Sequence, residues 1–257
     1  MKQGQINVFV VIGILLVAGV ILVFLFKTGK IPSPNGSFEE NPQKYIESCI
    51  SPKIKEAVNL LNNQGGQINP ELFKRFKFSE DSDYQNISYL CYTSKNYLPC
   101  VNREPVFIAH LENEIYNYIS DEVKNCFESW KKSAEKQGYS VDAKELEYSV
   151  SLNPEQIILD INKEISLNKK EESSRFNKFQ IVIKDKIYDL AIISQEIASQ
   201  EAEYCNFENQ GFMLLYPEFN IDKFRTSDLN TIYTIQDRKS QEKMRIAIRG
   251  CVIPAGM

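Results

Sequence analysis

The sequence has few of the residues that metal sites and histidine-dependent enzymes need. It contains one histidine, His110, and its six cysteines include no C-x-x-C pair, so their spacing does not indicate a zinc site. The motifs H-E-x-x-H and G-x-S-x-G and the phosphate-binding glycine loop do not occur. We therefore predict no metal, no cofactor and no catalytic residue. The absence of these motifs favours a protein that is not an enzyme and leaves the enzymatic alternative open.

The chain also lacks a strong charge of either sign. Its net charge is −4 over 257 residues, whereas a nucleic-acid-binding protein needs a basic face to neutralise phosphates. We expect no nucleic-acid partner. A content of 43% hydrophobic and 25% charged residues is typical of a globular protein, with enough chain for one large domain or two small ones.

One long apolar run stands near the N-terminus. Residues 6–26 carry no charge, and Asn7 is their only polar side chain. A helix of this length is about 31 Å long, which matches the hydrocarbon core of a bilayer. A buried core helix is seldom apolar all round for so long, and the apolar part of a cleaved signal is shorter and ends in small residues. We predict a retained transmembrane helix in contact with membrane lipid.

The residues before this run carry a resemblance. Lys2, Gln3, Gly4 and Gln5 ahead of an apolar stretch resemble the class III signal peptide of archaeal type IV pilins. The resemblance implies processing at the Gly4–Gln5 junction on the cytoplasmic side, with the apolar helix retained. Phe9 stands where that family usually carries glutamate.

The whole chain resembles a group of uncharacterised membrane-anchored archaeal proteins. The resemblance is carried by the apolar run, the segment from Cys49 to Gly66, the segment Tyr89–Tyr92 and the closing segment Ala247–Pro254. It implies an anchored protein and no particular activity.

Two signals disagree on which side of the membrane the remaining chain lies. Lys2 and the α-amino group precede the apolar run, and Lys27, Lys30 and Lys44 follow it. Because positive charge is enriched on the cytoplasmic side of a membrane span, this count leans slightly towards a cytoplasmic C-terminus. An even set of cysteines outside the run is typical of an oxidising compartment, although six buried free thiols would be an alternative. We give the cysteines more weight and expect an extracytoplasmic domain.

The pattern divides the chain into a leader at 1–5, the transmembrane helix at 6–26, a juxtamembrane linker at 27–41 and a domain at 42–257. Apolar residues spaced three or four apart predict helices at 42–64, 105–137 and 186–204, with a kink or split at Pro52. Strands are predicted at 87–92, 145–152, 156–161, 176–183, 211–216, 231–236 and 244–252. Runs of adjacent strands favour an α+β fold with an antiparallel sheet, and their order is consistent with a duplicated α-βββ unit.

Six cysteines allow three disulfides among Cys49, Cys91, Cys100, Cys126, Cys205 and Cys251, in fifteen full pairings. Cys91 with Cys100 is the favoured single pair because it closes a short loop that contains Asn96 and Pro99.

Candidate functional side chains are few. The stretch from Asp81 to Cys100 is rich in tyrosine, which suits a binding surface, so we take Tyr84, Tyr89, Tyr92 and Tyr97 as candidate ligand-binding residues. Their high strand propensity is the alternative explanation. His110 with Glu114 could form an acid–base pair, but an exposed histidine beside a glutamate is the simpler interpretation. The helical carboxylates Glu196, Glu201 and Glu203 are more consistent with a solvated helix face than with paired catalytic acids.

The sequence thus favours a single-pass envelope protein that acts by binding or by structure, as a pilin-like subunit, an adhesin or an accessory subunit with a protein partner or self-assembly. The alternative is a membrane-tethered extracytoplasmic hydrolase, which would need a concave pocket with converging carboxylates.

Overall fold

The computed structural model describes residues 41–170 and 172–251. The predicted leader at 1–5, the predicted transmembrane helix at 6–26 and all but the last residue of the predicted linker at 27–41 lie outside the described residues. Among the residues that are described, no helix has both the length and the apolar character that crossing a membrane requires. The chain divides into a unit over Met1–Glu39 and a unit over Glu40–Met257, and the described residues belong to the second.

Three long helices form close to their predicted positions: α2 (Pro42–Asn63), α3 (Phe107–Lys136) and α4 (Ile187–Tyr204). At the start of α2, the Asn41 side chain accepts a hydrogen bond from the Gln43 amide at 3.0 Å. The predicted split at Pro52 is wrong, because α2 continues through this residue as one helix. Pro52 is exposed, so water can serve the carbonyl group that proline leaves without a donor.

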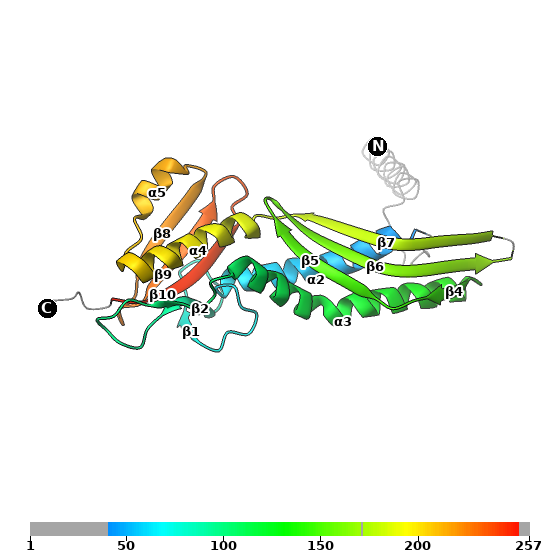
Figure 1. The fold of residues 1–257 in the computed structure, drawn as a ribbon, viewed down its shortest axis with the longest axis horizontal. Coiled ribbons are helices and arrows are strands. Elements are labelled where there is room, and N and C mark those ends of the chain that lie inside the picture. The colour runs from blue at the N-terminus through cyan, green and yellow to red at the C-terminus, as the bar shows by residue number, and fades with distance from the viewer. Residues whose placement is uncertain (1–40, 171, 252–257) are drawn as a thin grey trace, which may run out of the picture. The chain divides into compact units, whose positions relative to one another are not determined.

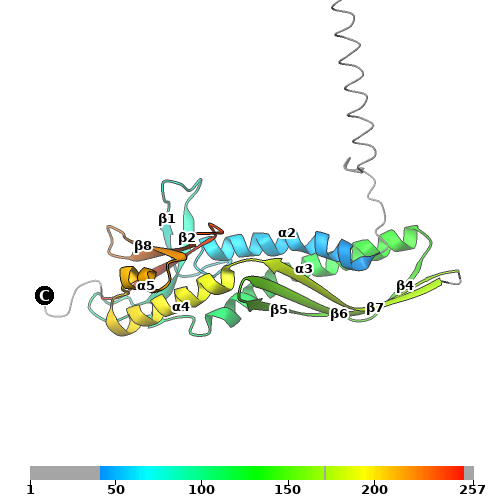
Figure 2. The same ribbon diagram turned by 90° about the horizontal axis from the view of Figure 1, so that it is seen from above.

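Helices α2 and α3 pack side by side in opposite directions (Figure 2). Cys49 is bonded to Cys126, and Lys53 Nζ donates to the Tyr118 hydroxyl at 3.2 Å, so α2 advances along the chain while α3 returns. Apolar side chains spaced three or four apart on both helices are fully buried, among them Ile46, Ile50, Leu111, Ile115 and Ile119. The buried stripes of the two helices therefore contribute much of the hydrophobic core.

This helix pair covers one face of a four-stranded antiparallel sheet made of β4 (Ser140–Ala143), β5 (Glu147–Asn153), β6 (Gln156–Lys169) and β7 (Glu172–Lys184) (Figure 1). β6 pairs with β7 on one side and with β4 and β5 on the other. Alternate residues of β6 are buried, and Phe127 of α3 meets Phe179 of β7 at 5.3 Å between ring centroids. The outer face is largely polar, as expected for a sheet with one solvated face, and Val182 of β7 is an exposed apolar exception.

The second sheet has six strands: β1 (Phe73–Phe76), β2 (Gln85–Tyr92), β3 (Val101–Asn102), β8 (Phe219–Arg225), β9 (Thr231–Asp237) and β10 (Lys243–Arg249). Its order is β1-β2-β10-β9-β8, with β3 paired to β2. The β2–β10 pair is parallel and the other pairs are antiparallel, so this sheet is mixed. The predicted α+β class is confirmed. The sheet predicted to be antiparallel is in fact two sheets, of which one is antiparallel and one is mixed.

Helix α4 lies on one face of the six-stranded sheet (Figure 1). The Ser194 hydroxyl on α4 reaches the Met244 sulfur on β10 at 3.3 Å, and the Tyr233 hydroxyl on β9 donates to Glu201 on α4. On the opposite face, Ile87, Tyr89, Ile232 and Ala247 form an apolar cluster against which Phe76 and Phe78 pack. The central strands are therefore buried on both sides.

A buried ion pair holds the loop between β1 and β2 onto this opposite face. Arg245 on β10 is 1% exposed and donates to both carboxylate oxygens of Asp81, at 2.9 and 2.7 Å, and to Glu80 at 2.9 Å. Its guanidinium lies over the Phe78 ring, 4.5 Å from the centroid. One guanidinium nitrogen of Arg245 serves both oxygens of Asp81 and another serves Glu80, so the charge-assisted bonds set the position of the loop as well as contributing energy.

Three of the sequence predictions need correction. Residues 211–216, predicted as a strand, belong mostly to the helix α5 (Asn209–Leu215), whose cap is the Glu208 side chain that accepts from the Gln210 amide. The strands β1, β3, β4 and β8 were not predicted. The duplicated α-βββ unit is not formed, because α3 is followed by four strands of one sheet and α4 by α5 and three strands that join β1 and β2.

The six cysteines form three disulfides: Cys49–Cys126, Cys91–Cys100 and Cys205–Cys251, with Cα–Cα distances of 6.0, 5.4 and 5.6 Å. The predicted local pair is confirmed. The other two link helix α2 to helix α3 and the end of α4 to the chain after β10, and the sequence alone left them open among the alternative pairings.

Candidate functional site

The four candidate tyrosines do not form one surface. Tyr89 is 6% exposed and its hydroxyl donates to Asn230 at 3.1 Å, so it belongs to the core of the six-stranded sheet. Burial raises the pKa of Tyr89 to about 12. Tyr92 packs against it at 5.0 Å between ring centroids. Tyr84 and Tyr97 are 62% and 63% exposed and lie in separate loops. Strand propensity, rather than ligand binding, accounts for Tyr89.

His110 is not the exposed residue that the sequence predicts. Its Nε2 lies 2.9 Å from the carbonyl oxygen of Gly66, and its Nδ1 lies 3.4 Å from Glu104. Glu114, the residue predicted beside it, instead accepts a hydrogen bond from the Ile68 amide at 2.8 Å. His110 therefore ties the start of α3 to the chain that leaves α2. An i, i+4 spacing could not reveal these contacts because both come from outside the helix.

The three candidate carboxylates of α4 lie in different environments. Glu201 is buried, where it accepts from the Tyr233 hydroxyl and lies 3.2 Å from Lys223 Nζ. Burial, together with the nearby Glu201 carboxylate, raises the pKa of Tyr233 above its usual range. Glu196 and Glu203 are exposed. The three residues do not converge on one point.

Cys49, Glu122 and Cys126 bring three potential ligand atoms within 4.8 Å of one another. The two sulfurs are bonded to each other in a disulfide, so neither is a thiolate that could bind a metal. The cluster is a structural link between α2 and α3.

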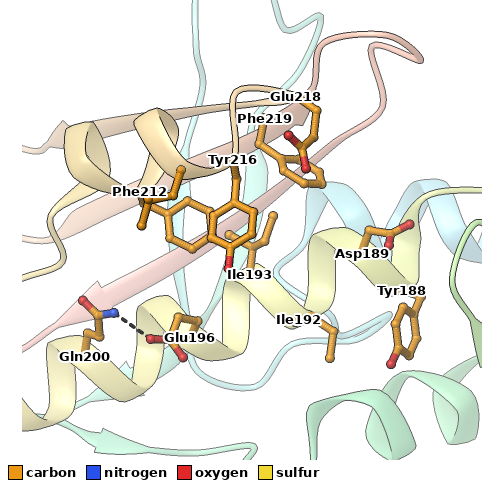
Figure 3. Close-up of a pocket in the computed structure, with 11 residues that line it drawn as sticks. Tyr188, Asp189, Ile192, Ile193, Glu196, Gln200, Phe212, Tyr216, Glu218 and Phe219 are labelled. Atoms are coloured by element: carbon orange, nitrogen blue, oxygen red, sulfur yellow. Dashed lines mark hydrogen bonds between the residues drawn. The ribbon is translucent and has the colours of Figure 1, made fainter.

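A hollow with a volume of about 730 Å³ lies between α4 and α5. We call it the α4–α5 groove. Helix α4 contributes Tyr188, Asp189, Ile192, Ile193, Glu196 and Gln200, and the chain from α5 into β8 contributes Phe212, Leu215, Tyr216, Glu218 and Phe219. Figure 3 shows the Phe212 and Tyr216 rings reaching from the α5 side over Ile193 of α4.

Side-chain contacts to the edge strand β8 hold α5 in place. Asn209 donates to the Ile221 carbonyl oxygen at 2.9 Å, and the Ile221 amide donates to the Met213 sulfur at 3.2 Å. Phe212 packs against Phe207 and Tyr216, at 5.5 and 4.7 Å between ring centroids. The helix thereby covers backbone groups that an edge strand would otherwise present to solvent.

Much of the apolar surface of α5 is nevertheless open. No residue of α5 is buried, and Leu214 and Leu215 are 85% and 77% exposed. Ile192 on the facing side of α4 is 45% exposed. Adjoining exposed apolar side chains around a groove are typical of a site for an apolar partner.

The charged side chains of the groove lie at its margin. Glu196 and Glu218 are exposed, and the Glu196 carboxylate accepts from Gln200 at 2.6 Å, a bond within one helix (Figure 3). Asp189 accepts weakly from the Glu155 amide at 3.3 Å and lies 3.8 Å from Lys186 Nζ. A glycosidase would need two carboxylates directed at one substrate bond from opposite sides. These carboxylates are better placed to attract a cationic group at the groove's margin.

A second hollow, of about 520 Å³, lies where β7 joins α4, among Glu155, Asp185, Lys186, Asp237 and Glu242. Its charges are largely satisfied within the fold. Lys186 Nζ bonds Glu155 at 2.6 Å, the Lys186 amide donates to Glu242 at 2.7 Å, and Asp185 accepts from the Ile187 amide at 2.8 Å. This cluster caps the N-terminus of α4 and joins the two sheets.

The sequence signal for the groove was the short apolar run within residues 211–216, which was predicted as a strand. Short apolar runs do not distinguish a strand from a helix.

Comparisons with models of known protein families, with curated protein sequences and with solved structures found no match to this chain.

Proposed function

We propose that this chain is a single-pass membrane-anchored protein whose domain lies on the extracytoplasmic side and binds a partner protein through the α4–α5 groove. The observation that carries the binding role is the exposure of Leu215 and Ile192, two apolar residues that line the same groove from facing elements. Exposed apolar side chains gathered at one hollow are typical of an interaction site, whereas single exposed ones are common on any protein surface. An accessory subunit fits this arrangement best among the roles considered.

The location rests on separate grounds. Three disulfides are typical of a protein that folds outside the cytoplasm, and the apolar run at 6–26 has the length of a membrane span. The likeness of Lys2–Gln5 to a class III signal peptide supports processing at the Gly4–Gln5 junction.

The groove can be tested with a peptide library displayed on phage and selected against the full chain in lipid nanodiscs. We expect the selected peptides to lose at least about tenfold in affinity on Leu215→Asp or Ile192→Asp, because a buried unpaired carboxylate opposes apolar contact. Val182→Asp is the matched control, since Val182 on β7 is 47% exposed and lies outside the groove. Selected peptides that bind both groove variants as tightly as the unmodified chain would contradict the proposal.

A further inference from the structure

The charge of the α4–α5 groove restricts what can occupy it. Its lining residues include the carboxylates of Asp189, Glu196 and Glu218 and no lysine or arginine. Asp189 is partly balanced by Lys186, 3.8 Å away. Across the part of the chain that the structure describes, neither Glu196 nor Glu218 has a cationic partner within 4.0 Å. The groove therefore combines an apolar floor with an acidic margin.

The two carboxylates come from opposite sides of the apolar floor. Glu196 belongs to α4, and Glu218 belongs to the segment between α5 and β8 (Figure 3). An occupant that covers Ile192, Ile193 and Leu215 would thus have an acidic group on each flank. An apolar stripe with lysine or arginine on both sides satisfies all of these contacts.

Resting on the proposed function, we infer that the occupant is an amphipathic segment of a partner protein with an apolar stripe flanked by lysine or arginine. A membrane surface fits less well, because anionic lipid headgroups would meet Glu196 and Glu218. A symmetric contact between two copies fits less well too, because it brings the same acidic margin against itself. Docking of a basic amphipathic segment into the groove incurs neither of these charge repulsions.

Three synthetic peptides test the inference. They share one leucine stripe and one photo-crosslinking residue and differ only in flanking lysine, glutamine or glutamate. Each is titrated, at low salt, against the full chain in phosphatidylcholine nanodiscs, with empty nanodiscs as background, and the crosslinked residues of the chain are mapped by mass spectrometry. We expect crosslinks in α4 and α5, and binding of the lysine peptide about fivefold tighter than that of the glutamine peptide.

The carboxylates supply the matched variants. Glu196→Gln combined with Glu218→Gln should bring the lysine and glutamine peptides to within about twofold of each other, as should about 1 M salt. Glu147→Gln combined with Glu172→Gln, two exposed residues of the four-stranded sheet, should leave the preference unchanged.

The outcomes separate the two proposals. Equal binding of the three peptides, with crosslinks in α4 and α5, would overturn the charge inference and leave the binding groove standing. A lysine preference that survives the Glu196 and Glu218 substitutions would also overturn the inference. Crosslinks that avoid α4 and α5 for all three peptides would overturn both proposals.

Discussion

Arg245 is the residue on which the position of the loop after β1 depends most directly. It is the partner of Asp81, whose side chain is 11% exposed. Burial alone would raise the pKa of Asp81, but hydrogen bonds from Arg245 and the Phe78 amide lower it below its usual value. Most of the charge of both groups is therefore compensated within the fold.

We expect Arg245→Met to lower the free energy of unfolding by about 3 kcal/mol, because it leaves the Asp81 carboxylate without its partner. Adding Asp81→Asn should recover part of the loss, since the second change removes the unpaired charge. Denaturant unfolding of both variants under non-reducing conditions measures the coupling. A single variant within about 0.5 kcal/mol of the unmodified chain would refute this role for the ion pair.

Asp185, at the start of α4, makes the stability of the fold depend on pH. Burial, opposed by the Ile187 amide and reinforced by Glu242, raises its pKa from 3.8 to about 6. A raised pKa means that the folded state binds this proton more tightly than the unfolded state. The contribution to stability is thus complete below pH 3.8 and is lost as the pH rises through 6.

Asp185→Asn should therefore be more stable than the unmodified chain at pH 7–8, by at most about 3 kcal/mol, and should differ little near pH 4. Part of the gain is offset because the neutral amide of the variant no longer places a negative charge at the helix N-terminus. Thermal or denaturant unfolding across pH 4–8 checks this, with the exposed Asp142→Asn as a control. A stability difference that does not change with pH would show that Asp185 keeps its usual pKa.

Among the elements, α2 and α3 depend on the longest cross-link. Cys49–Cys126 joins residues 77 apart in sequence, whereas Cys91–Cys100 joins residues 9 apart. In the chain-entropy account, a longer closed loop restricts the unfolded chain more. We expect Cys49→Ala with Cys126→Ala to cost about 4–5 kcal/mol, and Cys91→Ala with Cys100→Ala about 2–3 kcal/mol.

Guanidinium unfolding of the two double variants measures the order of these costs. A smaller loss for the long loop would show that residual contacts between these two segments already restrict the unfolded chain. The unmodified chain gives a separate test of compartment. After isolation from its own membranes and denaturation, it should take up no iodoacetamide unless a reductant is added. Six modified cysteines would contradict the extracytoplasmic location.

For the molecule as a whole, the proposed anchor decides where the domain works. We expect the full chain to sediment with membranes at high salt, because its apolar run is long enough to span a bilayer. Deletion of residues 6–26 should release it into the soluble fraction. Recovery of the full chain in the soluble fraction without detergent would contradict the anchor. An intact Met1 on the mature protein would exclude processing at Gly4–Gln5 and leave the anchor unaffected.

Local patterns were sufficient for most of the elements of this fold. The periodic apolar residues of α2, α3 and α4 identify these helices, and Gly65 and Gly66, both with positive φ, end the first of them. The pattern failed at α5 because five apolar or aromatic residues around Phe212 fit a strand as well as a helix. It missed β8 because only Phe219 and Ile221 of that strand are buried.

The sequence by itself determined the apolar run, the α+β class, the long helices and the local Cys91–Cys100 bond, because each depends on residues close together in the chain. Only the tertiary structure decided the parallel pairing of β2 with β10, the two long-range disulfides and the α4–α5 groove. The groove needs α5 to dock on the β8 edge, through Asn209 and Met213 against Ile221, before its residues face α4. Such contacts between distant segments depend on how packed elements meet, which no local spacing encodes.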